Sequence, residues 1–185
     1  RLDENAEITL LESSGHISFA NCGLPYHIGG EISSRDALLL RTPEDLWKRY
    51  RIKAIVGAKV TSVDRAAKTV TYSHGATTET IFYDKLILSQ GGEPAVPKVE
   101  GIENIRNFSL RWIEDMDAII AALKNLQHQR IAIVGGGFIG IEVAEAMIMR
   151  GLKVTLFEFA PNVMPNLDPE FSNLARRALE AKGVE

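Results

Sequence analysis

Residues 131–159 read IAIVGGGFIGIEVAEAMIMRGLKVTLFEF, and this stretch decides the fold of the C-terminal part of the chain. The continuous apolar run at residues 131–134 predicts a buried strand. A helix is expected over residues 138–150 and ends before Gly151, because glycine is favoured just beyond a helix C-terminus. A second strand is expected over residues 153–159. The order strand, helix, strand predicts a parallel α/β unit.

Three glycines join the first strand to the helix: Gly135, Gly137 and Gly140, in the pattern G-x-G-x-x-G. The first permits a tight turn, the second lets the backbone approach a pyrophosphate, and the third lets helix and strand pack closely. The N-terminus of the helix offers unpaired N–H groups to the phosphates. Glu158 ends the second strand, where a carboxylate binds a ribose 2′-hydroxyl and would repel a 2′-phosphate. The sequence therefore predicts a dinucleotide site that prefers NADH to NADPH.

Three further residues of the same segment are candidates for this site. Phe138 is either a core residue or a cover for a cofactor ring, and Ile139 follows it between the last two glycines. Glu142 is expected in the first turn of the helix, where its charge would complement the positive N-terminus whether or not a ligand binds.

Cys22 is the only cysteine of the chain, and it lies in the stretch SFANCGLPYHIGG at residues 18–30. A single cysteine excludes an internal disulfide framework and indicates a reducing compartment. Residues 23–30 could start a helix, and a helix N-terminus favours the thiolate, which is the nucleophile that attacks a disulfide or polysulfide. The alternative is a buried cysteine that only packs. The four histidines, His27 among them, show no zinc-ligand spacing, so no metal is expected.

The N-terminal part of the chain suggests a second nucleotide-binding unit. Residues 8–12, ITLLE, predict a buried strand, and its last residue, Glu12, is placed to bind a ribose hydroxyl. The first strand and glycine loop of such a unit should come before it. We therefore expect the chain to begin in the middle of a βαβ unit and the working protein to be longer.

The sequence between these two units is rich in predicted β-structure. Thr42, Pro43 and Asp45 form the start of a short helix with a capping box. Strands are expected over residues 52–58, 60–64, 69–73, 78–82 and 86–89, the second and third forming an antiparallel hairpin. Glycines and prolines at residues 91–97 then break the chain. Helices are expected over residues 117–127 and, after Asp168 and Pro169, to about residue 182.

Composition excludes several classes of protein. The 185 residues are 45% hydrophobic and carry a net charge of −3, so no strongly basic face invites nucleic acid or an anionic membrane. No apolar run reaches the ~18–20 residues needed to span a bilayer. The first residues also lack the apolar core of a signal peptide. We expect a cytoplasmic protein that binds neither nucleic acid nor membranes.

Four motifs resemble the single-cysteine branch of the FAD-dependent pyridine nucleotide–disulfide oxidoreductases, which includes coenzyme A disulfide reductases and NADH-dependent persulfide or polysulfide reductases. The motif around the cysteine is NCGLPY at residues 21–26. The others are YDKLILSQGGEP at residues 83–94, SLRWIEDMDAI at residues 109–119 and VGGGFIGIE at residues 134–142.

The resemblance implies specific roles for residues of this chain. Cys22 would be the redox cysteine, and Phe138 would gate the space between flavin and nicotinamide. The residues implied to contact the thiol substrate are Arg1, Ser18 and Asn21, with Arg1 near the coenzyme A phosphates. The residues implied to contact FAD are Glu12, Val60, Ser89, Gly91 and Arg111.

The expected fold class is α/β, with parts of two Rossmann-like nucleotide-binding domains, for FAD and NAD(P), and an antiparallel β-hairpin insertion. The predicted domains are a partial FAD-binding domain at residues 1–95, a linker at 96–116 and a partial NAD(P)-binding domain at 117–185. The expected cofactors are FAD and NADH, and the full-length protein is expected to be a homodimer.

Three functions remain open from the sequence. The first is NAD(P)H-dependent reduction of coenzyme A disulfide, a persulfide or a polysulfide through Cys22. The second keeps both cofactors but uses a Cys22 sulfenic acid to reduce oxygen or peroxide. The third is a non-catalytic dinucleotide-binding module.

Overall fold

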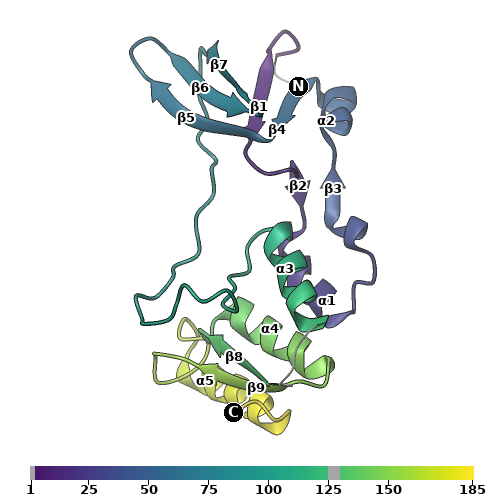
Figure 1. Cartoon of the computed structure of the whole chain (residues 1–185), viewed down its shortest axis with the longest axis vertical. Coiled ribbons are helices and arrows are strands. Elements are labelled where there is room, and N and C mark those ends of the chain that lie inside the picture. The colour runs from purple at the N-terminus through teal and green to yellow at the C-terminus, as the bar shows by residue number, and fades with distance from the viewer. Residues whose placement is uncertain (1–2, 125–129) are drawn as a thin grey trace. The chain divides into compact units, whose positions relative to one another are not determined.

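The computed structural model describes residues 3–124 and 130–185, and the chain divides into two compact units. Unit 1 contains the described residues up to Phe19 together with Leu39–Gly92, and unit 2 contains Ala20–Leu38 and Glu93–Glu185 (Figure 1). The predicted boundary at residue 95 lies close to the division at residue 92. Residues 20–38, expected in the first domain, pack in unit 2 instead. The naming of the two parts as FAD- and NAD(P)-binding domains stays a prediction.

Unit 1 contains a short parallel sheet. β1 (Ile8–Glu12) pairs with β4 (Ile52–Val56) in a register that runs from Ile8 opposite Ile52 to Glu12 opposite Val56. The strand predicted at residues 8–12 is therefore confirmed. The strand predicted at residues 52–58 is wrong at its end, because Gly57 has a φ of 67° and turns the chain after Val56.

Between β1 and β4, the chain forms three small elements of unit 1. β2 (Ser18–Phe19) pairs antiparallel with β3 (Leu39–Arg41). α2 (Pro43–Tyr50) then begins with the predicted capping box. The Thr42 hydroxyl accepts the Asp45 N–H at 3.2 Å, and the Asp45 carboxylate accepts the Thr42 N–H at 3.2 Å.

An antiparallel three-stranded sheet completes unit 1. β5 (Ala58–Asp64), β6 (Thr69–His74) and β7 (Thr77–Phe82) follow one another as a meander, which confirms the predicted hairpin and the strand after it (Figure 1). No strand forms at residues 86–89, although one was predicted. Nothing in the described part of the chain pairs with this segment, and a strand needs a neighbour for its N–H and C=O groups. Ile87 and Leu88 are accordingly 87% and 72% exposed.

Unit 2 contains the expected α/β unit. β8 (Arg130–Val134) and β9 (Lys153–Phe157) are parallel neighbours, joined through α4 (Phe138–Met149). α5 (Pro169–Ala181) follows, and a bridge between Val154 and Val184 starts a further parallel pairing. The elements predicted at residues 131–159 and after Asp168 are confirmed, except that β9 ends two residues early.

Two further helices of unit 2 precede this α/β unit. α1 (Leu24–Gly29) follows a 3₁₀ turn at Asn21–Gly23, and a second 3₁₀ turn spans Arg35–Leu38. α3 (Ile113–Lys124) begins four residues before the predicted start. The reason is the Asp115 carboxylate, which accepts the N–H groups of Arg111 and Trp112, both at 2.9 Å, and so satisfies the start of the helix. The predicted end at residue 127 lies outside the described residues.

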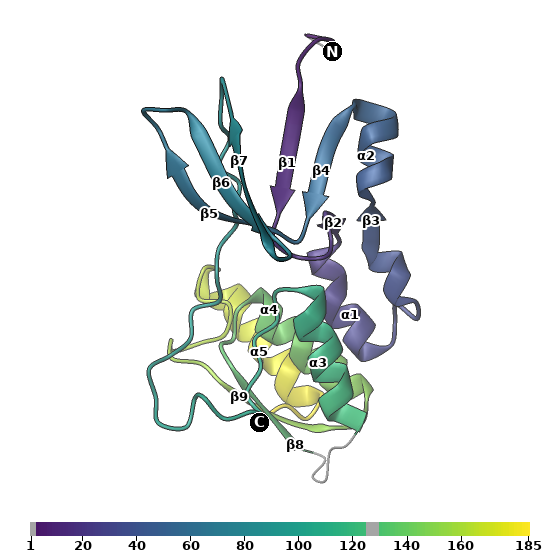
Figure 2. The same ribbon diagram turned by 45° about the horizontal axis from the view of Figure 1, so that its top comes forward.

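α4 lies at the centre of unit 2. It contacts β8, β9 and α1, and this explains why its apolar residues are spread around the helix rather than along one stripe (Figure 2). A Cβ on Gly29 of α1 would lie 3.2 Å from the Ala146 Cα, so the two helices pack closely. The Arg150 guanidinium, just beyond α4, donates to the Ile28 carbonyl of α1.

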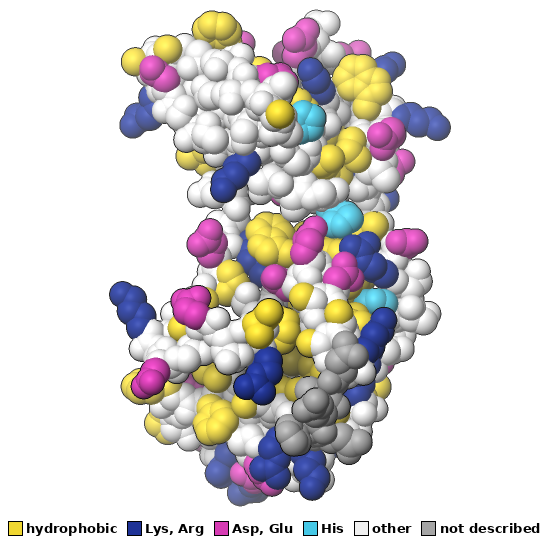
Figure 3. Space-filling model, in the orientation of Figure 1, with side chains coloured by type: hydrophobic (Ala, Val, Ile, Leu, Met, Phe, Trp, Pro, Cys, Tyr) yellow, Lys and Arg dark blue, Asp and Glu magenta, His cyan; other side chains and the backbone are white. Residues whose placement is uncertain are grey.

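Hydrophobic side chains also reach the surface of both units (Figure 3). Those with the largest exposed fractions are Phe82, Ile87, Ile105 and Phe159. Among the helices in residues 3–124 and 130–185, none has the length and apolarity needed to cross a bilayer.

Candidate functional site

The glycine loop between β8 and α4 has the geometry that its sequence predicts. Gly135 has a φ of 106°, which only glycine adopts freely. A Cβ on Gly140 would lie 1.9 Å from the Gly135 carbonyl oxygen, so the third glycine is required for close packing of helix and loop. A Cβ on Gly137 would meet no atom within 4 Å, which leaves open space where a phosphate can approach.

The N-terminus of α4 adjoins this open space. Gly137 is the N-cap residue, and no side chain in the described residues bonds to the first turn of the helix. The N–H groups of that turn can therefore bind an anion. Phe138 and Ile139 follow Gly137 at the start of α4, and their side chains are 57% and 58% exposed rather than packed in the core. These observations fit the pyrophosphate and rings of a dinucleotide.

Glu158 lies directly against the glycine loop. Its carboxylate accepts the Gly136 N–H at 2.6 Å and the Ala160 N–H at 2.8 Å. Bonds from the N–H groups of Ala160 and Gly136 lower the pKa of Glu158 below its ordinary value, so a negative charge is held at the end of β9. The sequence identified Glu158 but missed Gly136, because the pattern leaves that position open.

Glu142 is placed differently from the prediction. α4 begins at Phe138, and its first turn contains no acidic residue, so Glu142 lies in the second turn. The favourable interaction of a carboxylate with a helix N-terminus falls off within the first turn. The predicted electrostatic role of Glu142 is therefore weakened, and its place in the cofactor site stays a prediction.

Cys22 is exposed to solvent, which rules out a purely packing role. It lies in the 3₁₀ turn before α1, beside the equally exposed Asn21. The turn is held by a bond from the Ala20 N–H to the Leu38 carbonyl at 2.9 Å. A Cβ on Gly23 would lie 2.5 Å from Leu38 Cδ2, so the residue after the cysteine must be small.

The His27 side chain is hydrogen-bonded to the backbone of the same segment. Its Nδ1 lies 2.6 Å from the Ile32 carbonyl oxygen. Groups of acidic, histidine or cysteine side chains able to hold a metal ion do not occur in the described residues.

Unit 1 carries most of the residues predicted to contact FAD. Glu12 ends β1 at the carboxyl edge of the parallel pair, where its carboxylate accepts the Ser14 N–H at 2.7 Å. Val60, in β5, is 42% exposed. Ser89 and Gly91 lie in the exposed segment after β7, and Gly91 has a φ of 73°.

The remaining predicted site residues are dispersed. Arg111 belongs to unit 2, where its guanidinium lies 4.9 Å from the centre of the Trp112 ring. Its buried Nε has no hydrogen-bond partner in the described part of the chain, which fits a site that supplies an acceptor such as a phosphate or a flavin carbonyl. Ser18 lies in β2 of unit 1. Arg1 lies outside the described residues.

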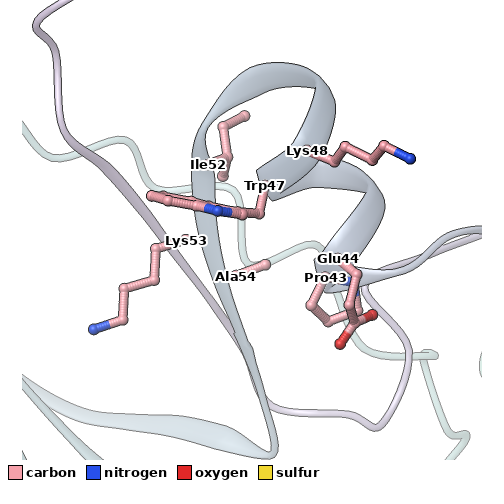
Figure 4. Close-up of a pocket in the computed structure, with 7 residues that line it drawn as sticks. All are labelled: Pro43, Glu44, Trp47, Lys48, Ile52, Lys53 and Ala54. Carbon is pink, nitrogen blue, oxygen red and sulfur yellow. The ribbon is translucent and has the colours of Figure 1, made fainter.

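A hollow between α2 and β4 contains none of the predicted site residues. It is lined by Pro43, Glu44, Trp47, Lys48, Ile52, Lys53 and Ala54, with the Trp47 ring along one side (Figure 4). The Arg51 guanidinium lies 5.4 Å from the centre of that ring. The hollow is a surface feature of unit 1 and adds nothing to the dinucleotide site.

Comparison with known proteins decides the family. Residues 1–185 match the profile of the family described as pyridine nucleotide-disulphide oxidoreductase. The chain belongs to this family. The α/β fold class predicted from the sequence is thereby confirmed, and family membership supports FAD and NADH as cofactors.

The names of individual relatives describe different activities. Over its whole length the chain is 32% identical to an NADH oxidase of Methanocaldococcus jannaschii and 34% identical to a coenzyme A disulfide reductase of Staphylococcus haemolyticus, covering 42% of each. The structure of an NAD-dependent persulfide reductase from A. fulgidus superposes with a TM-score of 0.93 at 32% identity, over 99% of this chain and 35% of that one. The chain thus spans less than half the length of these relatives.

Proposed function

We propose that this chain is the cysteine-bearing part of a flavin-dependent NADH oxidoreductase that reduces coenzyme A disulfide, a persulfide or a polysulfide through Cys22. The observation that carries the proposal is that unit 2 contains both an exposed lone thiol and a preformed dinucleotide loop. α1 follows the Cys22 turn and packs on α4, the helix whose N-terminus adjoins that loop. The names of the relatives support the same chemistry.

Each group of residues has a distinct task in this function. The loop at residues 135–140 and Glu158 bind NADH, with Glu158 on the adenosine ribose. Phe138 is proposed to gate the space between flavin and nicotinamide, and its 57% exposure supports this. The residues proposed to bind FAD are Glu12, Val60, Ser89, Gly91 and Arg111. When bound, FAD supplies the ability to accept a hydride from NADH and to pass an electron pair to sulfur.

Cys22 performs the step at sulfur. Its thiolate attacks one sulfur of the substrate RS–SR, so the RS–SR bond breaks, a Cys22–S–SR bond forms and RS⁻ leaves. The electron pair that originates in NADH then cleaves the Cys22–S–SR bond and regenerates the thiolate. With protons from water, RS–SR, NADH and one proton give two RSH and NAD⁺. Asn21, Ser18 and Arg1 are proposed to bind the R group, Arg1 through phosphates.

The test is a Cys22→Ser variant of the full-length protein. Retained flavin absorption and NADH binding are expected, together with at least a 100-fold loss of NADH-dependent reduction of coenzyme A disulfide, because a hydroxyl cannot form the mixed disulfide. Ser33→Ala, a change at an exposed serine of the same unit, serves as the control and should keep the parent rate. Parent-level disulfide reduction by Cys22→Ser would refute the mechanism.

A second candidate is reduction of oxygen or peroxide through a Cys22 sulfenic acid. The relative from Methanocaldococcus jannaschii named NADH oxidase favours it, as does the exposure of the thiol. Comparing kcat/KM for peroxide, oxygen and coenzyme A disulfide in the full-length protein separates the two. A colourless full-length protein that binds NADH would instead support a non-catalytic module.

A further inference from the structure

Met164 has an unusual backbone. It lies between β9 and α5, in the segment that follows Glu158, and its φ is 51°. Residues with a Cβ rarely adopt this left-handed conformation, and they keep it only where the surrounding contacts fix it. Both polar backbone groups of Met164 are bonded. Its N–H donates to the Gly136 carbonyl at 2.8 Å, and its carbonyl accepts both the Leu167 N–H at 2.9 Å and the Ser172 hydroxyl at 3.0 Å.

Ser172 is buried in α5. It is only 2% exposed. A hydroxyl in such a place needs a partner, and here it is the Met164 carbonyl, with the Leu167 carbonyl at 3.4 Å. The next residue, Asn173, accepts a bond from the Asn162 side chain at 2.8 Å. α5 therefore holds the segment at two points.

The series of hydrogen bonds ends at Gly136, which lies between the first two glycines of the G-x-G-x-x-G pattern. Gly136 receives the Met164 N–H at its carbonyl and gives its own N–H to Glu158. The Val163 side chain packs against Gly136, since a Cβ on Gly136 would lie 2.9 Å from Val163 Cγ1. A loop fixed in this way loses little conformational freedom when a ligand binds.

We propose that Ser172 is a positioning residue of the dinucleotide site. Its hydroxyl, together with the Leu167 N–H, holds the Met164 carbonyl and so keeps Met164 in the left-handed conformation. Met164 in turn holds the Gly136 carbonyl, and the Gly136 N–H stays against the Glu158 carboxylate. The inference rests on the proposed function, because it takes NADH to bind at residues 135–140.

The first test is Ser172→Ala in the full-length protein, assayed with NADH at saturating disulfide. KM for NADH should rise about fivefold, the factor expected for one lost hydrogen bond of ~1 kcal/mol. The value of kcat should stay within twofold and the flavin absorption should not change, because Ser172 touches no reacting atom. An unchanged KM, or a fall in kcat alone, would overturn the proposal.

The second test changes the backbone of Met164 and holds even where Ser172→Ala does not fold. Met164→Gly should keep KM for NADH within twofold, because glycine adopts this φ without strain. Met164→Val should raise it about fivefold or more, because a β-branched residue is an outlier there. Equal effects of the two substitutions would overturn the proposal, since the side chain rather than the backbone would then matter.

Lys68→Val is the matched control. Lys68 also has a φ of 51°, but it lies in the turn between β5 and β6 of unit 1. KM for NADH should change less than twofold, and a rise equal to that of Met164→Val would overturn the proposal. A parent protein that does not use NADH at all would refute the proposed function itself, which is a separate result from an unchanged KM in Ser172→Ala.

Discussion

Glu158→Gln should lower both the free energy of unfolding and the preference for NADH over NADPH. The carboxylate accepts two backbone N–H groups, from Gly136 at 2.6 Å and Ala160 at 2.8 Å. A glutamine has one carbonyl oxygen, so its NH₂ group must face the second N–H donor. Loss of one hydrogen bond to a charged group costs ~2 kcal/mol. The free energy of unfolding at pH 7, measured by urea denaturation, should fall by this amount.

The dependence of this loss on pH follows from the sign of the pKa shift. The pKa of Glu158 is lowered in the folded state, so its contribution is present above the ordinary value near 4.5 and is lost as the pH falls through the folded value. The difference in unfolding free energy between the wild type and Glu158→Gln should therefore stay constant from about pH 7 to pH 5.5 and shrink below about pH 4.5.

A surface carboxylate of the same unit provides the control. Glu180, paired with Arg176 at 3.7 Å on α5, is exposed, and Glu180→Gln should change the unfolding free energy by less than ~0.5 kcal/mol. A loss as large as that of Glu158→Gln would contradict the reasoning. So would a Glu158→Gln defect that persists undiminished in acid, because the bonds to Gly136 and Ala160 would then not depend on charge.

Nucleotide preference gives an independent readout of the same substitution. In the proposed function, Glu158→Gln removes the charge that would repel a 2′-phosphate and weakens the acceptor for the 2′-hydroxyl. The ratio of kcat/KM for NADPH to that for NADH should rise about tenfold, which corresponds to ~1.4 kcal/mol. An unchanged ratio would show that Glu158 does not face the ribose.

Two predictions concern unit 1. Thr42→Ala removes the N-cap bond to Asp45 and should lower the unfolding free energy by ~1 kcal/mol in urea denaturation, whereas Thr42→Ser should keep the parent value. Tyr72→Phe removes the 2.7 Å bond to Glu79 and should cost ~1 kcal/mol. That bond raises the pKa of Tyr72 above its ordinary value of 10.0, so the bond stabilises the fold below pH 10 and is lost as the pH rises beyond it. The stabilities of wild type and Tyr72→Phe should therefore converge in alkaline solution, and a constant difference would contradict the assignment.

Local sequence signals predicted most elements because they depend on near neighbours. The glycine loop, the cap at Thr42 and the hairpin of β5 and β6 each result from residues a few positions apart. The predictions that failed depended on pairing partners or side-chain hydrogen bonds that a local pattern does not reveal. Residues 86–89 have the composition of a strand but no described neighbour to pair with. The start of α3 moved because the Asp115 side chain supplies acceptors that helical periodicity does not reveal.

The amino-acid sequence alone supplied the residues on which the proposed function rests: one thiol, a glycine pattern and an acid after the second strand. These signals are readable because each chemical task restricts the residue type at a fixed spacing. Only the tertiary structure decided that residues 20–38 pack with unit 2, that Gly136 is held by Glu158 and Met164, and that buried Ser172 supports them. Those contacts join segments that are far apart in the chain or lie in irregular turns, where packing and hydrogen-bond geometry rather than local composition set the conformation.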